Sequence, residues 1–284
     1  MSEAIVYING EYFTKQEAKI SVYDHGFLYG DGIFEGIRIY NQEVFKCEEH
    51  INRLYDGAKS IALEIPVDKG QMIRTTREAA AKSNIKNGYI RLIVSRGTGD
   101  LGINPLTCKQ ASIVIIVDKI QIYPKEMYDS GMKVITAVTR RNSPASLDPQ
   151  LKSLNYLNNI LAKIEANHAG AAEAIMLNQN GFVCECTGDN IFIVKQGSIY
   201  TPPVHLGALN GITRNTVIDL AGKMGLDVQE KELTMTNVYS ADEVFLTGTA
   251  AEIIGVAEVD KRIIANGVVG NVTKKLADNF RSVL

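Results

Sequence analysis

The sequence predicts an α+β protein made of two α/β domains. In the first half, hairpin patterns are followed by two amphipathic helical stretches and then by two strand patterns, which is not the repeating order of a parallel sheet. The chain has 284 residues, and at about 150 residues per domain this length suggests two domains. The longest purely apolar run, residues 113–117, suits a buried strand and is far shorter than the ~20 residues of a membrane span.

Composition excludes several classes of partner. The 30 Lys and Arg residues nearly balance the 32 Asp and Glu residues, so we expect no nucleic-acid or anionic-membrane partner. An acidic residue stands near the start, where a signal peptide carries basic residues, and we therefore expect a cytoplasmic protein. The four cysteines include no Cys-x-x-Cys pair and the four histidines are scattered, so no metal site is expected.

The chain pattern places the elements of the first half. Short strands are predicted within residues 4–24, with the Asn9-Gly10 dipeptide supplying a tight hairpin turn. A second hairpin is predicted over residues 34–46, with its turn at Asn41-Gln42. Two helices and two strands should then follow, at residues 48–63, 68–83, 89–96 and 111–120.

We predict an N-terminal domain over residues 1–120, a linker over residues 121–131, and a C-terminal domain, a pseudo-barrel with flanking helices, over residues 132–284. The linker region contains a proline, ends on a glycine and lacks periodicity. In the C-terminal domain we expect strands at 133–140, 173–177, 182–186 and 190–194 and helices near 155–168, 213–224 and 268–283. The first of these helices carries an apolar stripe of Leu154, Leu157, Leu161 and Ile164.

Residues 97–102 match the Gly-x-Gly-x-x-Gly pattern of dinucleotide-binding proteins. That pattern needs a helix starting at its third glycine, within a crossover of a dozen or more residues. Only residues 103–110 separate Gly102 from the next predicted strand, and Pro105 interrupts them. We therefore predict a hairpin loop and reject an NAD-binding site.

Four segments of the second half could carry chemistry. Lys152 is predicted immediately before or at the first turn of a helix, where the helix dipole favours a neutral, nucleophilic amine. A glycine turn leads into the helix that contains Thr213, and residues 247–251 form a second small-residue turn, so two sets of backbone N–H groups could bind anions. Taken alone, the first turn is better explained by an ordinary N-cap at Thr213. Glu185 lies in a short apolar strand, where it is either a buried carboxylate with a partner or a solvated outer residue.

Together these segments resemble the fold-type IV pyridoxal-phosphate enzymes, and most closely the branched-chain amino acid aminotransferases. The resemblance covers nearly the whole chain and rests on seven segments in the family's order. They are residues 29–38, 50–54, 89–92, 152–156, 185–190, 211–214 and 248–252.

The resemblance implies pyridoxal 5'-phosphate as the cofactor. Lys152 would bond covalently to its aldehyde and later move a proton between substrate and cofactor, Glu185 would pair with the pyridine nitrogen, and Tyr156 would bind the ring hydroxyl. The phosphate would be bound by Arg53, Ile212, Thr213 and Thr249, with Gly188, Asn190 and Gly211 completing the cofactor-binding set. The cofactor would sit in the cleft between the two halves, with Arg53 from the first domain and Lys152 from the second.

The implied activity is reversible amino transfer between L-leucine, L-isoleucine or L-valine and 2-oxoglutarate, with glutamate as the other amino acid, by ping-pong kinetics. Phe34 would hold the aliphatic side chain, and Arg91 or Arg38 would meet the distal carboxylate. The full substrate set implied is Tyr29, Phe34, Gly36, Arg38, Tyr89, Arg91, Thr249 and Ala250. Tyr29 and the loop 97–105 would reach a neighbouring subunit's site, in a homodimer or higher homo-oligomer.

Two alternatives share the fold: a D-amino acid aminotransferase and an aminodeoxychorismate lyase. The former carry an Arg-x-His carboxylate trap in the loop after the fourth strand, whereas the loop here has neither Arg nor His after Arg96. The latter would lack the combination of residues 34–38 and 248–251. A binding protein without a cofactor is the alternative from another class, and it would be colourless. Cys184 and Cys186 are expected to be inert packing residues.

Overall fold

The computed structural model describes residues 4–120 and 123–284. The first three residues of the chain and residues 121–122 of the predicted linker lie outside the described residues. The chain divides into two compact units, unit 1 (residues 1–121 and 151–155) and unit 2 (residues 122–150 and 156–284). The segment 151–155 thus groups with unit 1, although the sequence division assigns it to the C-terminal domain.

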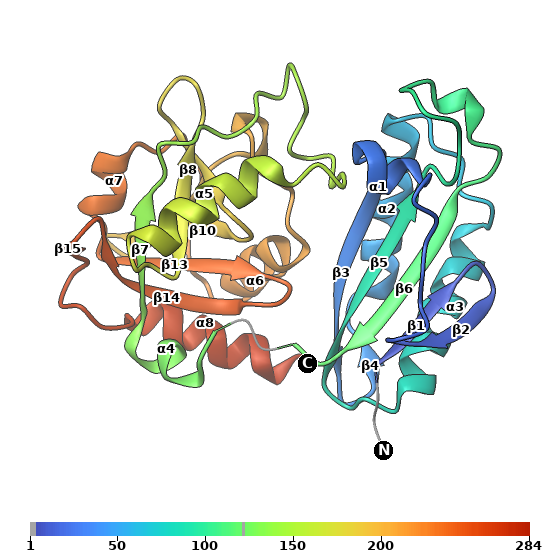
Figure 1. The fold of residues 1–284 in the computed structure, drawn as a ribbon. Helices are drawn as coiled ribbons and strands as arrows, with labels where there is room; N and C mark the ends of the chain where they lie inside the picture. Colours follow the sequence, from blue (N-terminus) through green and yellow to red (C-terminus); the bar gives the residue numbers. More distant parts are fainter. Residues whose placement is uncertain (1–3, 121–122) are drawn as a thin grey trace. The chain divides into compact units, whose positions relative to one another are not determined.

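Unit 1 is built on an antiparallel sheet in the order β2-β1-β6-β5-β3-β4, and helices α2 and α3 lie along one of its faces (Figure 1). Asn9 and Gly10 have positive φ, as do Asn41 and Gln42, so both predicted hairpin turns are confirmed. The strands are β1 (Ile5–Ile8), β2 (Glu11–Thr14), β3 (Gly32–Tyr40), β4 (Glu43–Val44), β5 (Gly88–Ser95) and β6 (Ser112–Asp118). The helices are α1 (His25–Tyr29), α2 (Cys47–Ser60) and α3 (Lys69–Ser83).

The core of unit 1 lies between the sheet and these two helices. Alternate residues of β3, including Ile33, Ile37 and Ile39, pack there with Ile51 and Leu54 of α2. Asp68 caps α3 through a hydrogen bond from the backbone N–H of Gln71. This arrangement covers one face of the sheet and leaves the other face to the side chains of the opposite alternation.

Unit 2 contains a nine-stranded mixed sheet in the order β12-β11-β10-β13-β14-β7-β8-β9, with β15 paired to β14. Its strands are β7 (Met132–Thr136), β8 (Glu173–Leu177), β9 (Val183–Cys186), β10 (Asn190–Lys195), β11 (Ser198–Thr201), β12 (Val228–Glu230), β13 (Glu243–Gly248), β14 (Glu252–Val259) and β15 (Arg262–Ile263). Its helices are α4 (Lys125–Ser130), α5 (Leu157–His168), α6 (Ile212–Lys223), α7 (Met235–Tyr239) and α8 (Asn271–Ser282). Two short 3-10 turns, η1 (Pro105–Thr107) in unit 1 and η2 (Val204–Leu206) in unit 2, complete the assignment.

This sheet must be rolled. Five strand spacings separate β10 from β9 along the hydrogen-bonded path, roughly 24 Å in a flat sheet. Only residues 187–189 join these two strands in sequence, and three residues with their flanking bonds span at most about 14 Å. The sheet therefore curls until β9 and β10 are neighbours again, which brings the two ends of the turn 187–189 together.

Two details of unit 2 differ from the sequence predictions. The predicted linker contains a helical turn, α4. The apolar stripe on α5 is not buried, because Leu157, Leu161 and Ile164 are 66%, 46% and 42% exposed, whereas Ala162 and Ala166 are fully buried. Alanine lets the helix pack closely on β8, so the small residues face the sheet and the large ones face outward. Among the described residues, no helix is long and apolar enough to cross a membrane.

The core of unit 2 allows a stability test. Leu246 in β13 is completely buried, and we expect Leu246→Ala to lower the free energy of unfolding by about 2–5 kcal/mol through lost burial and the cavity left behind. The matched variant Leu161→Ala should change it by less than about 1 kcal/mol. Urea denaturation checks both, and equal losses would contradict the assignment of the core.

Candidate active site

The substrate residues predicted in unit 1 share one face of its sheet. Strands β3 and β5 pair so that Phe34 lies opposite Ile93, Gly36 opposite Arg91 and Arg38 opposite Tyr89. Directly opposed residues and every second residue along a strand lie on the same side of a sheet. The predicted residues of β3 and β5 therefore converge on the face that α2 and α3 leave uncovered.

A close stack forms on this face. A Cβ atom on Gly36 would lie 1.8 Å from the hydroxyl of Tyr89, so only glycine lets the phenol cross β3. The guanidinium of Arg91 lies 4.5 Å from the ring centroid of Phe34 and 5.7 Å from that of Tyr89. An aromatic ring, a phenol and a guanidinium thus meet within one small area.

Lys152 is carried to the same place by backbone pairing. The N–H of Phe34 donates to the carbonyl of Lys152 at 3.0 Å, and Ser153 forms a bridge with Ile33. The ammonium nitrogen of Lys152 lies 4.4 Å from the centroid of the Phe34 ring, within the range of a cation–π contact. An amine is therefore placed over the ring that the sequence assigned to the substrate pocket.

This placement corrects the prediction that Lys152 stands at a helix start. Helix α5 begins at Leu157, five residues later, and the dipole of a helix acts only within about one turn of its end. The segment instead pairs with the first part of β3, which the short strand β4 does not reach. The helix-dipole argument for a neutral amine therefore does not apply.

Arg53 lies on the opposite side of β3, in a buried ion cluster that sequence reasoning missed. Its Nε and Nη2 atoms bind the two carboxylate oxygens of Glu35 at 2.7 and 2.8 Å, and Nδ1 of His50 lies 2.7 Å from the second of these oxygens. Glu35 and His50 are buried, whereas the side chain of Arg53 remains 16% exposed. The fork geometry fixes the guanidinium with its charge near the surface.

The charges of this cluster are set by its contacts. Burial raises the pKa of Glu35, but the charge and hydrogen bonds of Arg53, followed by those of His50, outweigh it and lower that pKa to about 2. Burial lowers the pKa of His50, and the nearby Lys152 lowers it further. The sequence contains a signal for this cluster, because the alternation of β3 places Glu35 on the otherwise apolar face of the strand.

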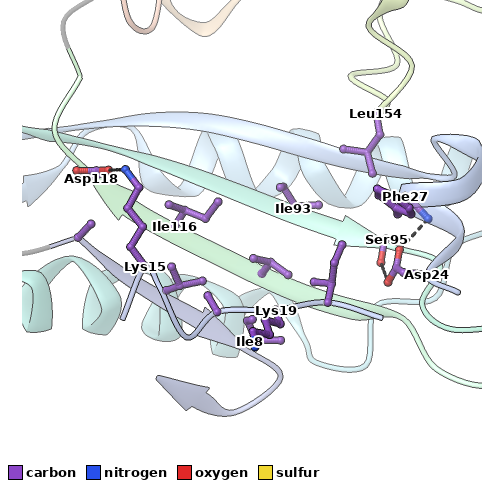
Figure 2. A pocket seen from close by; sticks show the side chains of 16 residues that line it. Ile8, Lys15, Lys19, Asp24, Phe27, Ile93, Ser95, Ile116, Asp118 and Leu154 are labelled. Atoms are coloured by element: carbon purple, nitrogen blue, oxygen red, sulfur yellow. Dashed lines mark hydrogen bonds and ion pairs between the residues drawn. The ribbon is translucent and has the colours of Figure 1, made fainter. Parts of the chain in front are cut away.

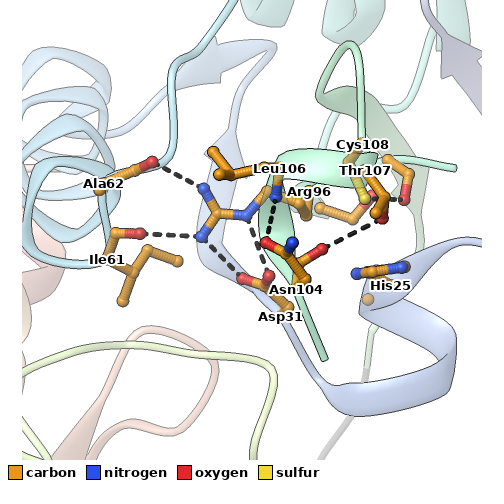
Figure 3. Close-up of polar contacts among 12 residues, drawn as sticks. His25, Asp31, Ile61, Ala62, Arg96, Asn104, Leu106, Thr107 and Cys108 are labelled. Atoms are coloured by element: carbon orange, nitrogen blue, oxygen red, sulfur yellow. Dashed lines mark hydrogen bonds and ion pairs between the residues drawn. The ribbon is translucent and has the colours of Figure 1, made fainter. Parts of the chain in front are cut away.

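Hydrogen bonds hold the loop after β5 at its base, as Figure 3 shows, and a further hydrogen bond joins the loop to Tyr29. Arg96 binds both oxygens of Asp31 and the carbonyls of Ile61 and Ala62, at distances between 2.7 and 3.0 Å. The N–H of Gly102 donates to the hydroxyl of Tyr29 at 2.8 Å. Strands β5 and β6 on either side are antiparallel neighbours, so the predicted hairpin loop is confirmed and the dinucleotide-binding alternative is excluded.

Glu185 is a buried carboxylate in unit 2, as one of the two sequence interpretations expected. Its oxygens accept from Nε of Arg141 at 2.8 Å and from the N–H of Leu209 at 2.9 Å. Arg141 also donates to Asn158 at the start of α5. Nothing local in the sequence marks Arg141, which lies in an irregular segment and meets Glu185 only through tertiary folding.

The start of α6 is a second feature of unit 2. Gly211, not Thr213, is its N-cap, and no side chain caps the first turn. Asn190 binds the carbonyl of Leu209 at 2.9 Å, and Thr247 lies opposite Asn190 on the neighbouring strand. The hydroxyl of Thr247 is buried and has no hydrogen-bond partner among the described residues.

The remaining predicted residues of unit 2 lie at the ends of strands and helices. Gly188 is in the turn between β9 and β10, Thr249 and Ala250 are in the turn between β13 and β14, and Tyr156 directly precedes α5. Cys184 and Cys186 are free and buried, and burial raises the pKa of both thiols, that of Cys184 to about 12. A protonated thiol is a poor nucleophile and metal ligand.

The Glu35 cluster allows a pH-dependent test. The lowered pKa of Glu35 means that its ionised form stabilises the fold above the ordinary carboxyl pKa near 4.5, and that this contribution is lost as pH falls toward 2. Glu35→Gln should therefore cost roughly 3–5 kcal/mol at pH 6, with the deficit narrowing on acidification. Denaturation from pH 6 to pH 3 checks this.

The matched control is Glu48→Gln, which removes the carboxylate of an exposed pair with Arg77. That variant should lose less than about 1 kcal/mol at every pH. A loss for Glu35→Gln that is equally small, or that does not depend on pH, would contradict the cluster's role.

Known proteins share this architecture. The family model for class IV amino-transferases matches residues 32–259. A protein of Methanocaldococcus jannaschii, whose name as a branched-chain-amino-acid aminotransferase is provisional, is 50% identical over 98% of this chain and 96% of its own length. The branched-chain-amino-acid aminotransferase of Pseudomonas aeruginosa is 38% identical over 96% of this chain and 91% of its own.

Solved structures agree. The crystal structure of the Escherichia coli branched-chain amino acid aminotransferase has a TM-score of 0.96 and 34% identity, covering 100% of this chain and 95% of that one. The T.th. branched-chain amino acid aminotransferase with pyridoxamine 5'-phosphate has a TM-score of 0.94 and 36% identity, covering 98% and 93%. Both the family model and the relatives span most of the chain, so the protein is a member of the class IV amino-transferase family with the fold-type IV architecture.

Proposed function

We propose that this protein is a pyridoxal 5'-phosphate-dependent aminotransferase that exchanges amino groups between branched-chain L-amino acids and 2-oxoglutarate. The observation that carries the proposal is the placement of the Lys152 amine over the Phe34 ring, beside Arg91, on one face of the unit 1 sheet. Relatives named as branched-chain aminotransferases support the substrate class.

The residues present suit the cofactor. Thr247 has a buried hydroxyl without a partner among the described residues, and Asn190 beside it donates to the carbonyl of Leu209 in the loop that leads into α6. The uncapped N–H groups of Ile212 and Thr213 would bind a phosphate, as would the guanidinium of Arg53 and the turn at Thr249. A buried polar group without a partner is costly, so a ligand at this place would satisfy it.

Bound cofactor would supply an aldehyde and an electron-accepting ring to the reaction. Glu185 would hold the ring nitrogen, and Arg141 would orient the Glu185 carboxylate through the hydrogen bond from its Nε atom. Tyr156 would bind the ring hydroxyl, with Gly188 and Gly211 allowing close approach of the backbone. These roles are inferred for this chain's residues from the family resemblance and the contacts described.

Lys152 would bond to the cofactor at rest and act as the base that moves the substrate α-proton. Its contact with Phe34 places the amine against the ring that would line the substrate pocket. Tyr89 and the turn at Thr249 and Ala250 would bind the substrate carboxylate. Gly36 would let the phenol of Tyr89 lie across β3, where it could bind that carboxylate.

One pocket must accept an aliphatic and an acidic side chain in turn. Phe34 offers apolar surface for leucine, isoleucine or valine, and Arg91 lies over that same ring. A guanidinium stacked on an aromatic ring can bind a carboxylate without leaving its place. We therefore favour Arg91 as the group that binds 2-oxoglutarate and glutamate. Arg38 stacks on Tyr40 instead of Phe34.

We further propose a homodimer formed through the open face of unit 1. A cavity of 430 Å³ lies on this face, with Ile8, Ile93, Ile116 and Phe27 among its lining residues (Figure 2). Phe27 is 67% exposed, and the loop after β5 exposes Leu101, Ile103 and Leu106 as well. Exposed apolar surface of this extent favours a protein partner, and a second copy would bring Tyr29 and this loop to a neighbouring site.

Substrate preference can be read from the cofactor's absorption. Adding L-leucine or L-isoleucine to purified holoenzyme should bleach its near-visible band, because the amino group passes to the cofactor, whereas D-alanine should leave the band unchanged. Stopped-flow absorbance measures both. The reverse preference would indicate a D-amino acid aminotransferase, and a colourless protein that does not take up the cofactor would exclude both activities.

The role of Glu185 can be tested by Glu185→Gln. The amide keeps the shape but loses the charge, and we expect turnover to fall roughly 10- to 100-fold, the cost of one charge-assisted hydrogen bond, with the circular dichroism spectrum unchanged. Glu230→Gln, which alters the pair of Glu230 with Arg214, is the control and should retain turnover. Equal turnover in the Glu185 variant and wild type would refute the role.

A further inference from the structure

Three buried side chains that the proposed reaction does not use meet at the turn 187–189. They are Glu173 in β8, Asp189 in the turn itself and Tyr123 ahead of α4, which are 2%, 7% and 8% exposed. The hydroxyl of Tyr123 lies 3.2 Å from Oδ2 of Asp189 and 3.5 Å from Oε2 of Glu173. Two carboxyl groups therefore share one phenol.

The number of protons shared by Tyr123, Asp189 and Glu173 decides whether the two contacts of the phenol are favourable. A phenol has one proton to donate, and an ionised carboxylate can only accept. With both carboxyl groups ionised, one of them would face the phenol oxygen without a hydrogen between them, and two negative charges would be buried close together. With one extra proton, one carboxyl group donates to the phenol oxygen while the phenol donates to the other, and each contact is satisfied.

The contacts indicate which group carries the proton. Oε1 of Glu173 accepts from the N–H groups of Ala174 and Thr187 at 2.7 and 3.1 Å, and such donors favour an ionised carboxylate. Among the described residues, Tyr123 is the single hydrogen-bond partner of the Asp189 side chain. The geometry therefore assigns the charge to Glu173 and the proton to Asp189.

The net effect of the surroundings on the pKa of Asp189 also favours its protonated form. Burial, followed by the charge of Glu173, raises the pKa of Asp189 to about 7, and Glu185 on β9 adds to the rise. The hydrogen bond from Tyr123 and the charge of Lys163 on α5 oppose this rise, and the Lys163 ammonium is engaged with the carbonyl of Ala172. Cys186 is the remaining titratable neighbour, and burial raises the pKa of its thiol.

Asp189 also touches the turn that the proposed function uses. A Cβ atom on Gly248 would lie 1.9 Å from Oδ1 of Asp189, so the backbone at Gly248 rests against this carboxyl group. Gly248 ends β13 and opens the turn that contains Thr249 and Ala250. The N–H of Cys186 donates to the carbonyl of Asp189 at 2.7 Å and fixes the position of Asp189 in its own turn.

We propose that Asp189 is a neutral carboxylic acid in the folded protein, sharing one buried proton with Glu173 through Tyr123, and that in this form it positions Gly248 and the turn after it. Loss of the proton would place a second negative charge in the same buried volume, next to that turn. The cluster is then a positioning element whose state depends on pH. This inference does not depend on the substrate or the cofactor of the enzyme.

Infrared spectroscopy of the holoenzyme tests the proton directly. A protonated carboxyl group gives a C=O band separate from those of carboxylates, and we expect this band at pH 6 and its loss as pH rises above about 7. Carbon-13 labelling of aspartate alone should shift the band, and labelling of glutamate alone should leave it. Absence of the band, or a shift with glutamate labelling only, would overturn the assignment to Asp189.

Stability gives a second, independent readout. Between its ordinary pKa of 3.8 and a folded value near 7, Asp189 is ionised only in the unfolded chain, so wild-type stability falls as pH rises through this window. Asp189→Asn resembles the neutral acid and lacks this dependence. The ratio of the variant's unfolding constant to that of wild type should therefore fall from pH 5 to pH 7, by at most about tenfold per pH unit.

Asp242→Asn is the matched control, because hydrogen bonds from Gln196 and Lys195 lower the pKa of Asp242. That group is ionised in both states from pH 5 to pH 7, so its variant should keep a constant ratio. A constant ratio for Asp189→Asn as well would overturn the proposal. If the Asn variant does not fold, the infrared titration of the wild-type protein decides alone.

Discussion

The alternation of side chains along β3 is the constraint on which the site in unit 1 depends. One set, Phe34, Gly36 and Arg38, faces the uncovered side of the sheet, while Glu35 faces the helices and holds Arg53. The same strand then binds the backbone of residues 151–155 and so places Lys152 over Phe34. A shift of the register by one residue would reverse every one of these placements.

Unit 2 differs from unit 1 in that it buries several carboxyl groups near its proposed site. Rolling of the sheet brings β9 back beside β10, and the turn between them carries Asp189 while β9 carries Glu185. Glu185 is paired with Arg141, whereas the proposed neutral Asp189 needs no cation. The residues of unit 2 proposed to hold a cofactor thus lie in turns, near strand ends or at the starts of α5 and α6.

The sequence predicted the local structure well where the signal was local. Both hairpins follow from dipeptides that tolerate positive φ, at Asn9-Gly10 and Asn41-Gln42, and the loop after β5 was too short for a crossover helix. The resemblance identified the family because its segments span both units. These features depend on residues close together in the chain, so one sequence is sufficient to predict them.

Other features depend on contacts between distant residues and could not be predicted in this way. The Arg141 contact joins residues 44 positions apart, and the Tyr123 cluster brings together three separate segments. The large residues of α5 look like a core stripe, but the alanines on its other face allow closer packing on β8. Lys152 was assigned to a helix start because an apolar pattern follows it, and only the pairing with β3 shows that a strand carries it.

The proposed reaction depends on Lys152 as the residue that bonds to the cofactor. Borohydride reduction of the purified holoenzyme, followed by digestion and mass spectrometry, tests this role. We expect the phosphopyridoxyl label on the peptide containing Lys152 and no label in Lys152→Ala. Lys133→Ala, which alters a lysine on the surface of unit 2, should be labelled like the wild type. Label on another lysine of the wild-type protein, or label retained by the Lys152 variant, would contradict this role.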